Sequence, residues 1–160
     1  MGFTQYFEFK KPVVGQAKKT ELVYQKAIKE CAKIVRYYST EFGGLSGYSA
    51  HCEPREYGGI KFNGSARVGG CEDFVLREHY SENIIDGNGF QFCKTAQLPY
   101  DQVVTACLIV LSHRLGGLVK VSSDGRAEDW NAGLVLAKHV LGLKSLRIPS
   151  SINRNEKTDA

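Results

Sequence analysis

The segment DQVVTACLIVLSHRL, residues 101–115, constrains the fold more than any other part of the chain. At the 3.6-residue period of a helix, its apolar residues are not confined to one side but surround its middle. Such a helix has to be covered by other elements on most sides. A chain of 160 residues can supply this cover, because a domain of that size buries about two-thirds of the surface that its unfolded chain exposes. We therefore expect residues 101–115 to form the centre of a layered domain.

Two further helices are expected. Between residues 21 and 39, apolar residues recur at spacings of three and four, which predicts a helix with one buried stripe. Thr20 stands where an N-cap belongs. Residues 127–141 predict another helix that ends at Gly142. The polar side of the first helix carries a row of cations that is either a solvated face or a polyanion contact: Lys26, Lys29, Lys33 and Arg36.

Short alternating or β-rich segments between turn residues predict strands. They cover residues 3–10, 47–52, 59–66, 72–80, 90–95 and 118–123. Asn63-Gly64 predicts either a tight turn or a bulge. In the strand at 90–95 we expect Phe90 and Phe92 to anchor the strand to the core, because the two rings share one face.

The order β-α-β(n)-α-β-α predicts an α+β fold. We expect a single domain over residues 1–148, in which about three helices pack on one mainly antiparallel sheet of five or more strands. The polar segment 149–160 is expected to be a flexible tail.

Composition narrows the setting of the protein. No run approaches the roughly 18 apolar residues of a membrane span, and the first residues lack the basic and apolar regions of a secretory signal. We therefore expect a cytoplasmic protein without a membrane partner, with its cysteines reduced. Cys31 and Cys107 fall inside apolar helical patterns and are expected in the core. The net charge of +4 favours anionic partners mildly.

The sequence contains no motif that names a reaction. Neither a zinc clamp nor a phosphate-binding glycine loop is present. A Cys93–His79 pair on neighbouring strands is one arrangement for nucleophilic catalysis. We expect no cofactor and no metal, and binding is favoured over enzymatic activity, which stays open. The fold has to decide whether a metal is held by any of His51, Cys52, Cys71, His79 and Cys93.

The junction FCKTAQLPYD combines the most varied side chains. Pro99 suits the entry to the following helix and Asp101 suits its N-cap, so both have structural reasons to be there. A cation, a hydroxyl and an aromatic ring have no such reason, and together they suit phosphate, ribose and base. With loop groups from elsewhere, the expected ligand site contains no catalytic residue and comprises Lys94, Thr95, Tyr100, Arg67, Ser122, Ser123 and Asp124.

Several short segments occur in a distinctive order: GFTQYF at the start, FNG at 62–64, FCKTA at 92–96, PYD at 99–101, and SSDG at 122–125 followed by Trp130. Over residues 1 to about 142, the chain thereby resembles a group of small accessory proteins encoded by tailed bacteriophages and their prophages. The resemblance implies a protein made in the host bacterial cytoplasm during infection, and it implies no particular activity. Small phage proteins of this kind often inhibit host defence.

Three functions are consistent with these features. The first is an anti-defence protein that binds and sequesters a nucleotide-type signalling ligand without chemistry. The second is a protein-binding inhibitor of a host factor, and the third is a nucleotide-processing enzyme with a Cys/His or Lys/Asp site. From the cationic helix we expect weak nucleic-acid binding at most. Self-association is left open.

Overall fold

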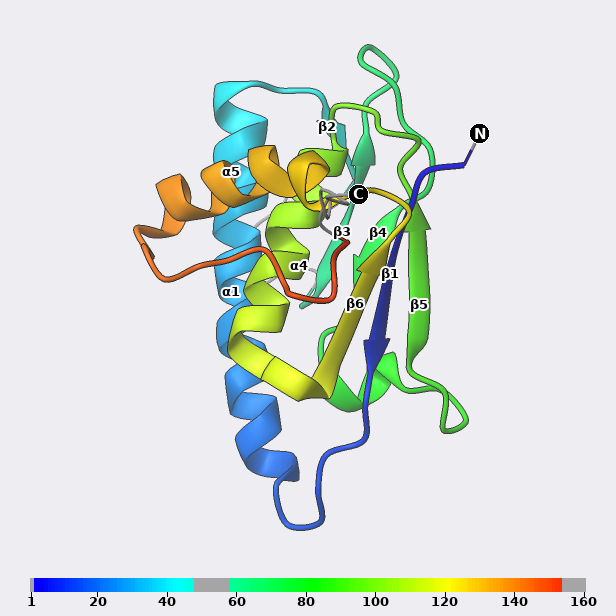
Figure 1. Ribbon diagram of the computed structural model, residues 1–160, viewed down its shortest axis with the longest axis vertical. Helices are drawn as coiled ribbons and strands as arrows, with labels where there is room; N and C mark the ends of the chain where they lie inside the picture. Colours follow the sequence, from blue (N-terminus) through cyan, green and yellow to red (C-terminus); the bar gives the residue numbers. More distant parts are fainter. Residues whose placement is uncertain (1, 48–57, 154–160) are drawn as a thin grey trace, which may run out of the picture.

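The computed structural model describes residues 2–47 and 58–153, and Figure 1 shows their arrangement. The α+β fold is confirmed. Its principal elements are β1 (Thr4–Phe9), α1 (Ala17–Glu41), β2 (Leu45–Ser46), β3 (Ile60–Gly64), β4 (Phe74–Leu76), β5 (Phe90–Lys94), α4 (Asp101–Leu115), β6 (Val119–Ser123) and α5 (Asn131–Leu141). Short 3-10 turns cover Tyr80–Asn83, Gly116–Leu118 and Ala127–Trp130.

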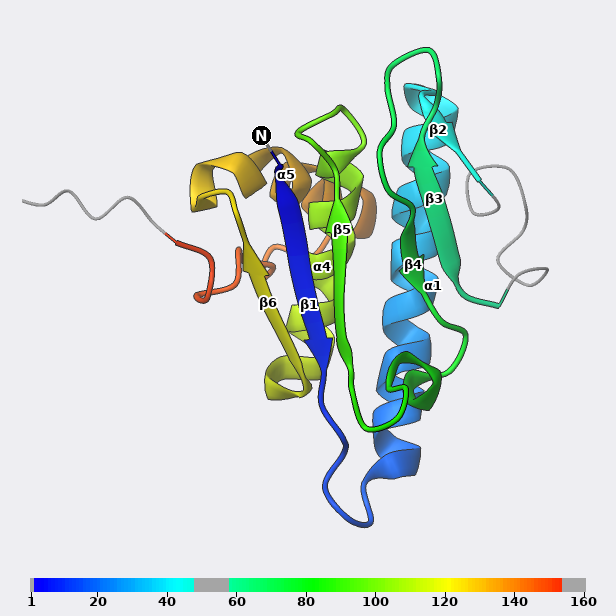
Figure 2. The same ribbon diagram turned by 90° about the vertical axis from the view of Figure 1, so that its right-hand side faces the viewer.

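The strands form two antiparallel sheets of three strands each, in the orders β5-β1-β6 and β2-β3-β4. The expected single sheet of five or more strands is therefore wrong. Figure 2 shows the two sheets side by side in one layer, with the helices behind them. The layer is split between β4 and β5, because β4 pairs with β3 and not with β5. At one end of the split, Glu72 contacts β5: its carboxylate accepts the backbone N–H of Lys94 at 2.7 Å, and its own N–H donates to the Lys94 carbonyl oxygen at 3.0 Å.

Helix α4 is the centre of the molecule, as its sequence predicts. It packs against α1, α5 and β6, and between Val103 and Leu111 eight apolar side chains have no exposed surface: Val103, Val104, Ala106, Cys107, Leu108, Ile109, Val110 and Leu111. Burial of each larger aliphatic side chain stabilises the fold by about 1.5–3 kcal/mol. The Cys31 thiol lies 3.7 Å from the Cys107 carbonyl oxygen, which places both expected core cysteines at the α1–α4 contact.

Helix α1 begins earlier than expected. Its N-cap is Gln16, and Thr20 lies buried inside the helix rather than capping it. The row of cations on the opposite side is exposed over its whole length, as expected. Next to this row, Glu30 binds the Arg114 guanidinium of α4 through two short contacts of 2.6 and 2.8 Å, which joins α1 to α4 at the edge of the core.

Other boundaries differ for local reasons. Most of the strand expected at 47–52 lies outside the described residues, and the strand expected at 72–80 shortens to β4 before the chain enters a 3-10 turn. Asn63-Gly64 forms neither the tight turn nor the bulge expected from sequence, because both residues pair with β2 in regular register at the end of β3. The first part of the expected tail is packed: Ile152 is buried, and the Asn153 carbonyl oxygen accepts the N–H of Ala127.

The contact between α4 and α5 depends on Gly133. A Cβ at this position would lie 2.1 Å from Thr105 Oγ1 and 2.9 Å from the backbone nitrogen of Ala106. Helix propensity alone favours Ala over Gly by about 1 kcal/mol, but we expect Gly133→Ala to lower the free energy of unfolding by about 1–3 kcal/mol, because the helices have to separate. Urea unfolding measures the change. Gly117→Ala is the control, since its Cβ would meet no atom within 4 Å. A stabilised Gly133→Ala variant would contradict this close packing.

Candidate functional site

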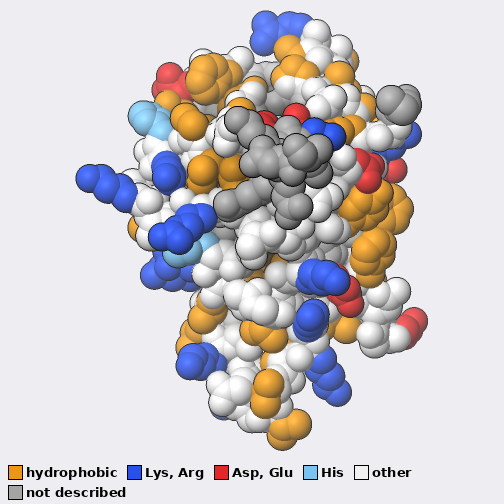
Figure 3. Space-filling view, in the orientation of Figure 1, with side chains coloured by type: hydrophobic (Ala, Val, Ile, Leu, Met, Phe, Trp, Pro, Cys, Tyr) orange, Lys and Arg blue, Asp and Glu red, His pale blue; other side chains and the backbone are white. Residues whose placement is uncertain are grey.

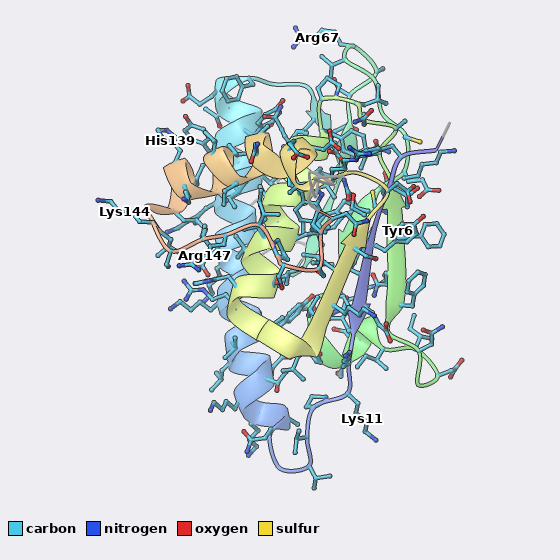
Figure 4. The ribbon with its side chains drawn as sticks, viewed as in Figure 1. Tyr6, Lys11, Arg67, His139, Lys144 and Arg147 are labelled. Atoms are coloured by element: carbon cyan, nitrogen blue, oxygen red, sulfur yellow. The ribbon has the colours of Figure 1, made fainter. Side chains whose placement is uncertain are left out.

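The residues of the expected ligand site do not converge on one pocket. Thr95 and Tyr100 have no exposed surface, so Tyr100 cannot stack on a base and Thr95 cannot reach a ligand. The exposed Arg67 lies in the loop between β3 and β4, beside Gly43, and Figure 4 shows it at the far end of the molecule from Lys11. The expected roles of Thr95 and Tyr100 as ligand contacts are therefore wrong, and the role expected for Arg67 stays a prediction.

Thr95 and Tyr100 instead hold the junction between β5 and α4 together. The Thr95 hydroxyl donates to Asp101 Oδ1 at 2.6 Å, and the same oxygen accepts the side-chain amide of Gln5 at 2.9 Å. Asp101 is thus not the N-cap of α4, which is Tyr100. The Tyr100 hydroxyl lies 2.8 Å from the Glu72 carbonyl oxygen and 3.1 Å from that of Lys94. Burial raises the pKa of both Asp101 and Tyr100.

The remaining members of the expected site lie at one end of the β5-β1-β6 sheet, where Lys94 and Ser122 are on its outer face, the face away from the helices, and Ser123 lies opposite the buried Gln5. Lys94 and Asp124 flank Thr4 from β5 and from the turn after β6, and Ser122 lies opposite Tyr6. The Asp124 carboxylate accepts the N–H of Thr4 at 3.0 Å and the hydroxyl of Tyr6 at 3.1 Å. Ser123 accepts the N–H of Gly125. Asp124 and Ser123 therefore have structural partners, whereas Lys94 and Ser122 are exposed.

An aromatic cluster dominates the outer face of the β5-β1-β6 sheet. The rings of Tyr6 and Phe90 stack with centroids 6.1 Å apart, and those of Phe90 and Phe92 are 6.4 Å apart. Phe90 is 50% exposed and Phe92 57%. In Figure 3 hydrophobic side chains gather at the right-hand edge, where Figure 4 labels Tyr6. The expectation that Phe90 and Phe92 anchor β5 to the core is wrong.

The strand turns its other face inward because its polar side chains find partners there. The Gln91 amide donates to the Asn83 carbonyl oxygen at 3.0 Å, and the buried Cys93 thiol lies 3.5 Å from the Glu72 carbonyl oxygen. The alternation of side chains along the strand does not show which face of FQFCK is buried, since each face carries residues that can be buried. The aromatic cluster was therefore missed from sequence. The signal for it was Tyr6, an aromatic residue out of phase with the buried Phe7 and Phe9 of its own strand.

A groove of about 480 Å³ opens beside this cluster, where the two sheets separate. Val75 and Arg77 line it from the β4 side, and Phe90 and Phe92 line it from the β5 side. Within residues 2–47 and 58–153, the Arg77 guanidinium has no ion-pair partner. The groove therefore places a guanidinium next to exposed aromatic rings.

The edge of β5 adds polar groups to the groove. The backbone of Lys94 turns away from β1, because its N–H and carbonyl oxygen contact Glu72. In an antiparallel pair the backbone groups alternate in direction along the strand. Phe92 lies two residues earlier and therefore also points its N–H and C=O away from β1, toward the split where no strand pairs with β5. A donor and an acceptor thus lie beside the exposed rings.

A larger hollow of about 640 Å³ lies between the β1–α1 loop and the 3-10 turn at Tyr80–Asn83. The carboxylate that lines it, Glu21, is already occupied: it accepts from the Tyr80 N–H and contacts His79 Nδ1 at 2.9 Å. Its cations are Lys11 and Lys18, both exposed. Its polar groups therefore serve the local fold more than a ligand.

The described residues do not support the catalytic pair considered from sequence. Cys93 contacts a carbonyl oxygen and His79 contacts Glu21, so the two do not meet. Burial raises the pKa of Cys93 to about 12, which keeps it a thiol at neutral pH.

One group of possible metal ligands occurs among the described residues. Glu78, His79 and Glu82 place ligand atoms within 4.8 Å of one another. All three are exposed, and Glu82 caps the turn by accepting the His79 N–H. Two residues of the metal set considered from sequence, His51 and Cys52, lie outside the described residues. None of the described helices combines the length and the apolar character that a bilayer crossing requires.

The role of Thr95 predicts a loss of stability on Thr95→Val. Valine keeps the shape of threonine but removes the donor, which leaves the buried Asp101 oxygen with one fewer hydrogen bond. We expect the free energy of unfolding to fall by about 1–3 kcal/mol, measured by chemical denaturation. Thr40→Val, at an exposed position of α1, is the control. An unchanged stability for Thr95→Val would contradict the structural role.

The contact between His79 and Glu21 predicts a pH-dependent stability. The hydrogen bond to Glu21 raises the pKa of His79 above 6.5. For Glu21, burial opposes ionisation, but hydrogen bonds from His79, Tyr80 and Gln25 lower its pKa below 4.5. The pair therefore stabilises the fold fully between these ordinary values, and the contribution is lost as the pH rises through the raised pKa of His79.

We expect His79→Gln to lower the melting temperature more at pH about 5.5 than at pH about 8.5, because only the protonated imidazole carries the charge. Thermal unfolding of both proteins at the two pH values measures this difference. An equal effect at both would show that the contact does not depend on charge.

Comparison with known proteins indicates no function for this chain. No protein-family model matches the chain. Searches of curated proteins and of solved structures also gave no match.

Proposed function

We propose that this chain is a non-catalytic binding protein whose outer sheet face binds the bases of a nucleotide-type ligand. The observation that carries the proposal is the row of three contacting rings, Tyr6, Phe90 and Phe92, left open on that face beside a groove. Contiguous exposed apolar patches on soluble proteins often mark interaction or ligand-binding sites. Stacking of a base on an aromatic side chain is worth about 1–3 kcal/mol.

The groups around the rings match the other parts of a nucleotide. The Arg77 guanidinium suits a phosphate, because it presents several donors in one plane and stays charged. The backbone N–H and C=O of Phe92 can pair with the donor and acceptor groups at the edge of a base. Lys94 and Ser122 lie exposed at the end of this face, where they can contact phosphate or ribose. The proposed ligand is therefore of the type expected from sequence, but most of the residues proposed to bind it are different.

A protein partner is the second candidate, and the charges of the same face favour it. Lys120 lies opposite Glu8 across the β1–β6 pairing, and Lys94 lies on the other side of Thr4 from Asp124. Charges of opposite sign are thus mixed around an apolar centre to which Ile85, 60% exposed, adds area. Protein interfaces have this plan of an apolar centre and a polar rim.

From the resemblance to phage accessory proteins, we propose that the protein acts in the cytoplasm of an infected bacterium. In an infected bacterial cytoplasm, a protein that holds a nucleotide signal without altering it counters a host defence that depends on that signal. A protein that blocks a host factor through the same face acts to the same end.

Phe92→Ala tests the site. We expect it to weaken binding roughly 5- to 150-fold, the equivalent of one lost base stack. The probes are fluorescently labelled nucleoside monophosphates, cyclic dinucleotides and oligothymidylates, measured by anisotropy, and chromatography after heat denaturation checks that the bound nucleotide is recovered intact. Phe42→Ala is the matched control, because Phe42 is 61% exposed and caps α1 rather than lying on the sheet.

Each outcome separates the candidates. Binding that Phe92→Ala weakens and Phe42→Ala does not, with the nucleotide recovered intact, supports the proposal. Altered nucleotide would show an enzyme. Absence of binding for every probe would overturn the nucleotide function and leave the protein partner.

A further inference from the structure

We infer that the ligand of this face is a single-stranded nucleic acid rather than a free nucleotide. The inference rests on the proposed function and adds the size of the ligand to it. The rings form a row across two strands: Tyr6 comes from β1, and Phe90 and Phe92 come from β5 at alternate positions. Stacking surfaces of this kind are tolerant of sequence, because every base has a flat face.

The shape of the site favours a polymer. A pocket that holds a small ligand tightly encloses most of its surface, typically 70–90% or more. Here the rings lie on an open sheet, and Phe90 and Phe92 each keep half or more of their surface in solvent. A mononucleotide on such a platform would leave one side of its base and most of its sugar in water. A strand gains affinity by placing successive bases on successive rings.

The cations beyond the rings lie too far from Tyr6 for one nucleotide to contact both. Lys10 continues the alternation of β1, so it shares the outer face with Tyr6, and its N–H still bonds the Leu118 carbonyl oxygen. Four extended residues span about 13 Å. Lys11 follows, and Figure 4 shows it pointing out below the sheet, on the same side of the molecule as Tyr6. Both lysines are exposed. A phosphate at Lys10 or Lys11 thus belongs to a later nucleotide than the base at Tyr6.

The acidic groups on this path limit the electrostatic contribution. Glu8 lies between Tyr6 and Lys10 on the same face, although Lys120 is opposite it. Asp86 lies in the turn before β5, and Asp124 is hydrogen-bonded to Tyr6. We therefore expect stacking to supply most of the affinity and a few phosphate contacts to supply the rest. This combination predicts a weak dependence on salt rather than the steep dependence of a polycationic surface.

The experiment is a length series. Thymidine monophosphate and labelled oligothymidylates of about two, five and ten nucleotides cover the site sizes of small single-strand-binding domains. We expect affinity to rise about tenfold or more from two nucleotides to ten. Phe92→Ala weakens binding at every length. The double variant Lys10→Ala/Lys11→Ala weakens binding of the longest strand and leaves the dinucleotide unchanged.

Salt dependence and a control variant complete the test. Loss of two phosphate contacts lowers the slope of log K against log salt by about 1.4 for a single strand. Lys144→Ala should change neither affinity nor slope, because Lys144 is exposed on the opposite side of the molecule (Figure 4). Thermal melts of all variants confirm that each is folded.

The outcomes distinguish this inference from the function beneath it. Affinity that depends on Phe92 but not on length would overturn the polymer and keep a nucleotide as the ligand. Equal binding of a duplex of the same sequence, unaffected by Phe92→Ala, would overturn the inference, because paired bases cannot stack on the rings. Absence of binding at every length would overturn both.

Discussion

The burial of α4 on all sides between Val103 and Leu111 is the constraint on which the rest of the structure depends. A helix that is apolar on all sides has to be enclosed, and here α1, α5 and the strand layer enclose it. The helices approach closely enough that Gly133 has no room for a side chain. Because the helices occupy one side of the layer, the other side of the sheet has no cover within the described chain. The face available for binding follows from how the core is closed.

The junction between β5 and α4 shows how readily a structural cluster is mistaken for a site. Thr95, Tyr100 and Asp101 have the side chains of a ligand pocket, but their hydrogen bonds are made inside the fold, where they hold the β5–α4 junction together. Asp101 binds both Thr95 and Gln5, and Tyr100 reaches the carbonyl oxygen of Glu72. Buried polar groups need such partners because an unmet hydrogen bond costs about 1–3 kcal/mol. The polar groups of these three side chains are therefore already hydrogen-bonded within the protein.

The split in the strand layer gives the outer face its binding character. Had β4 paired with β5, the backbone of Phe92 would be hydrogen-bonded and the groove beside it closed. Instead the Glu72 side chain satisfies one end of the β5 edge, and the middle of the edge faces the groove. Rings, backbone groups and the Arg77 guanidinium therefore occur together at one place. This coincidence, rather than any single residue, supports the proposed binding of bases.

The sequence by itself determined the α+β class, the order of the elements and the central position of α4, because these follow from local periodicity, turn residues and overall apolarity. It also placed Cys31 and Cys107 in the core. The division into two sheets and the outward direction of Phe90 and Phe92 were decided by the tertiary structure. Strand alternation defines two faces but does not say which is buried when both carry residues that can be. That choice depended on partners in the preceding turn and loop, Asn83 for Gln91 and Glu72 for Cys93, and such contacts exist only once the chain has folded.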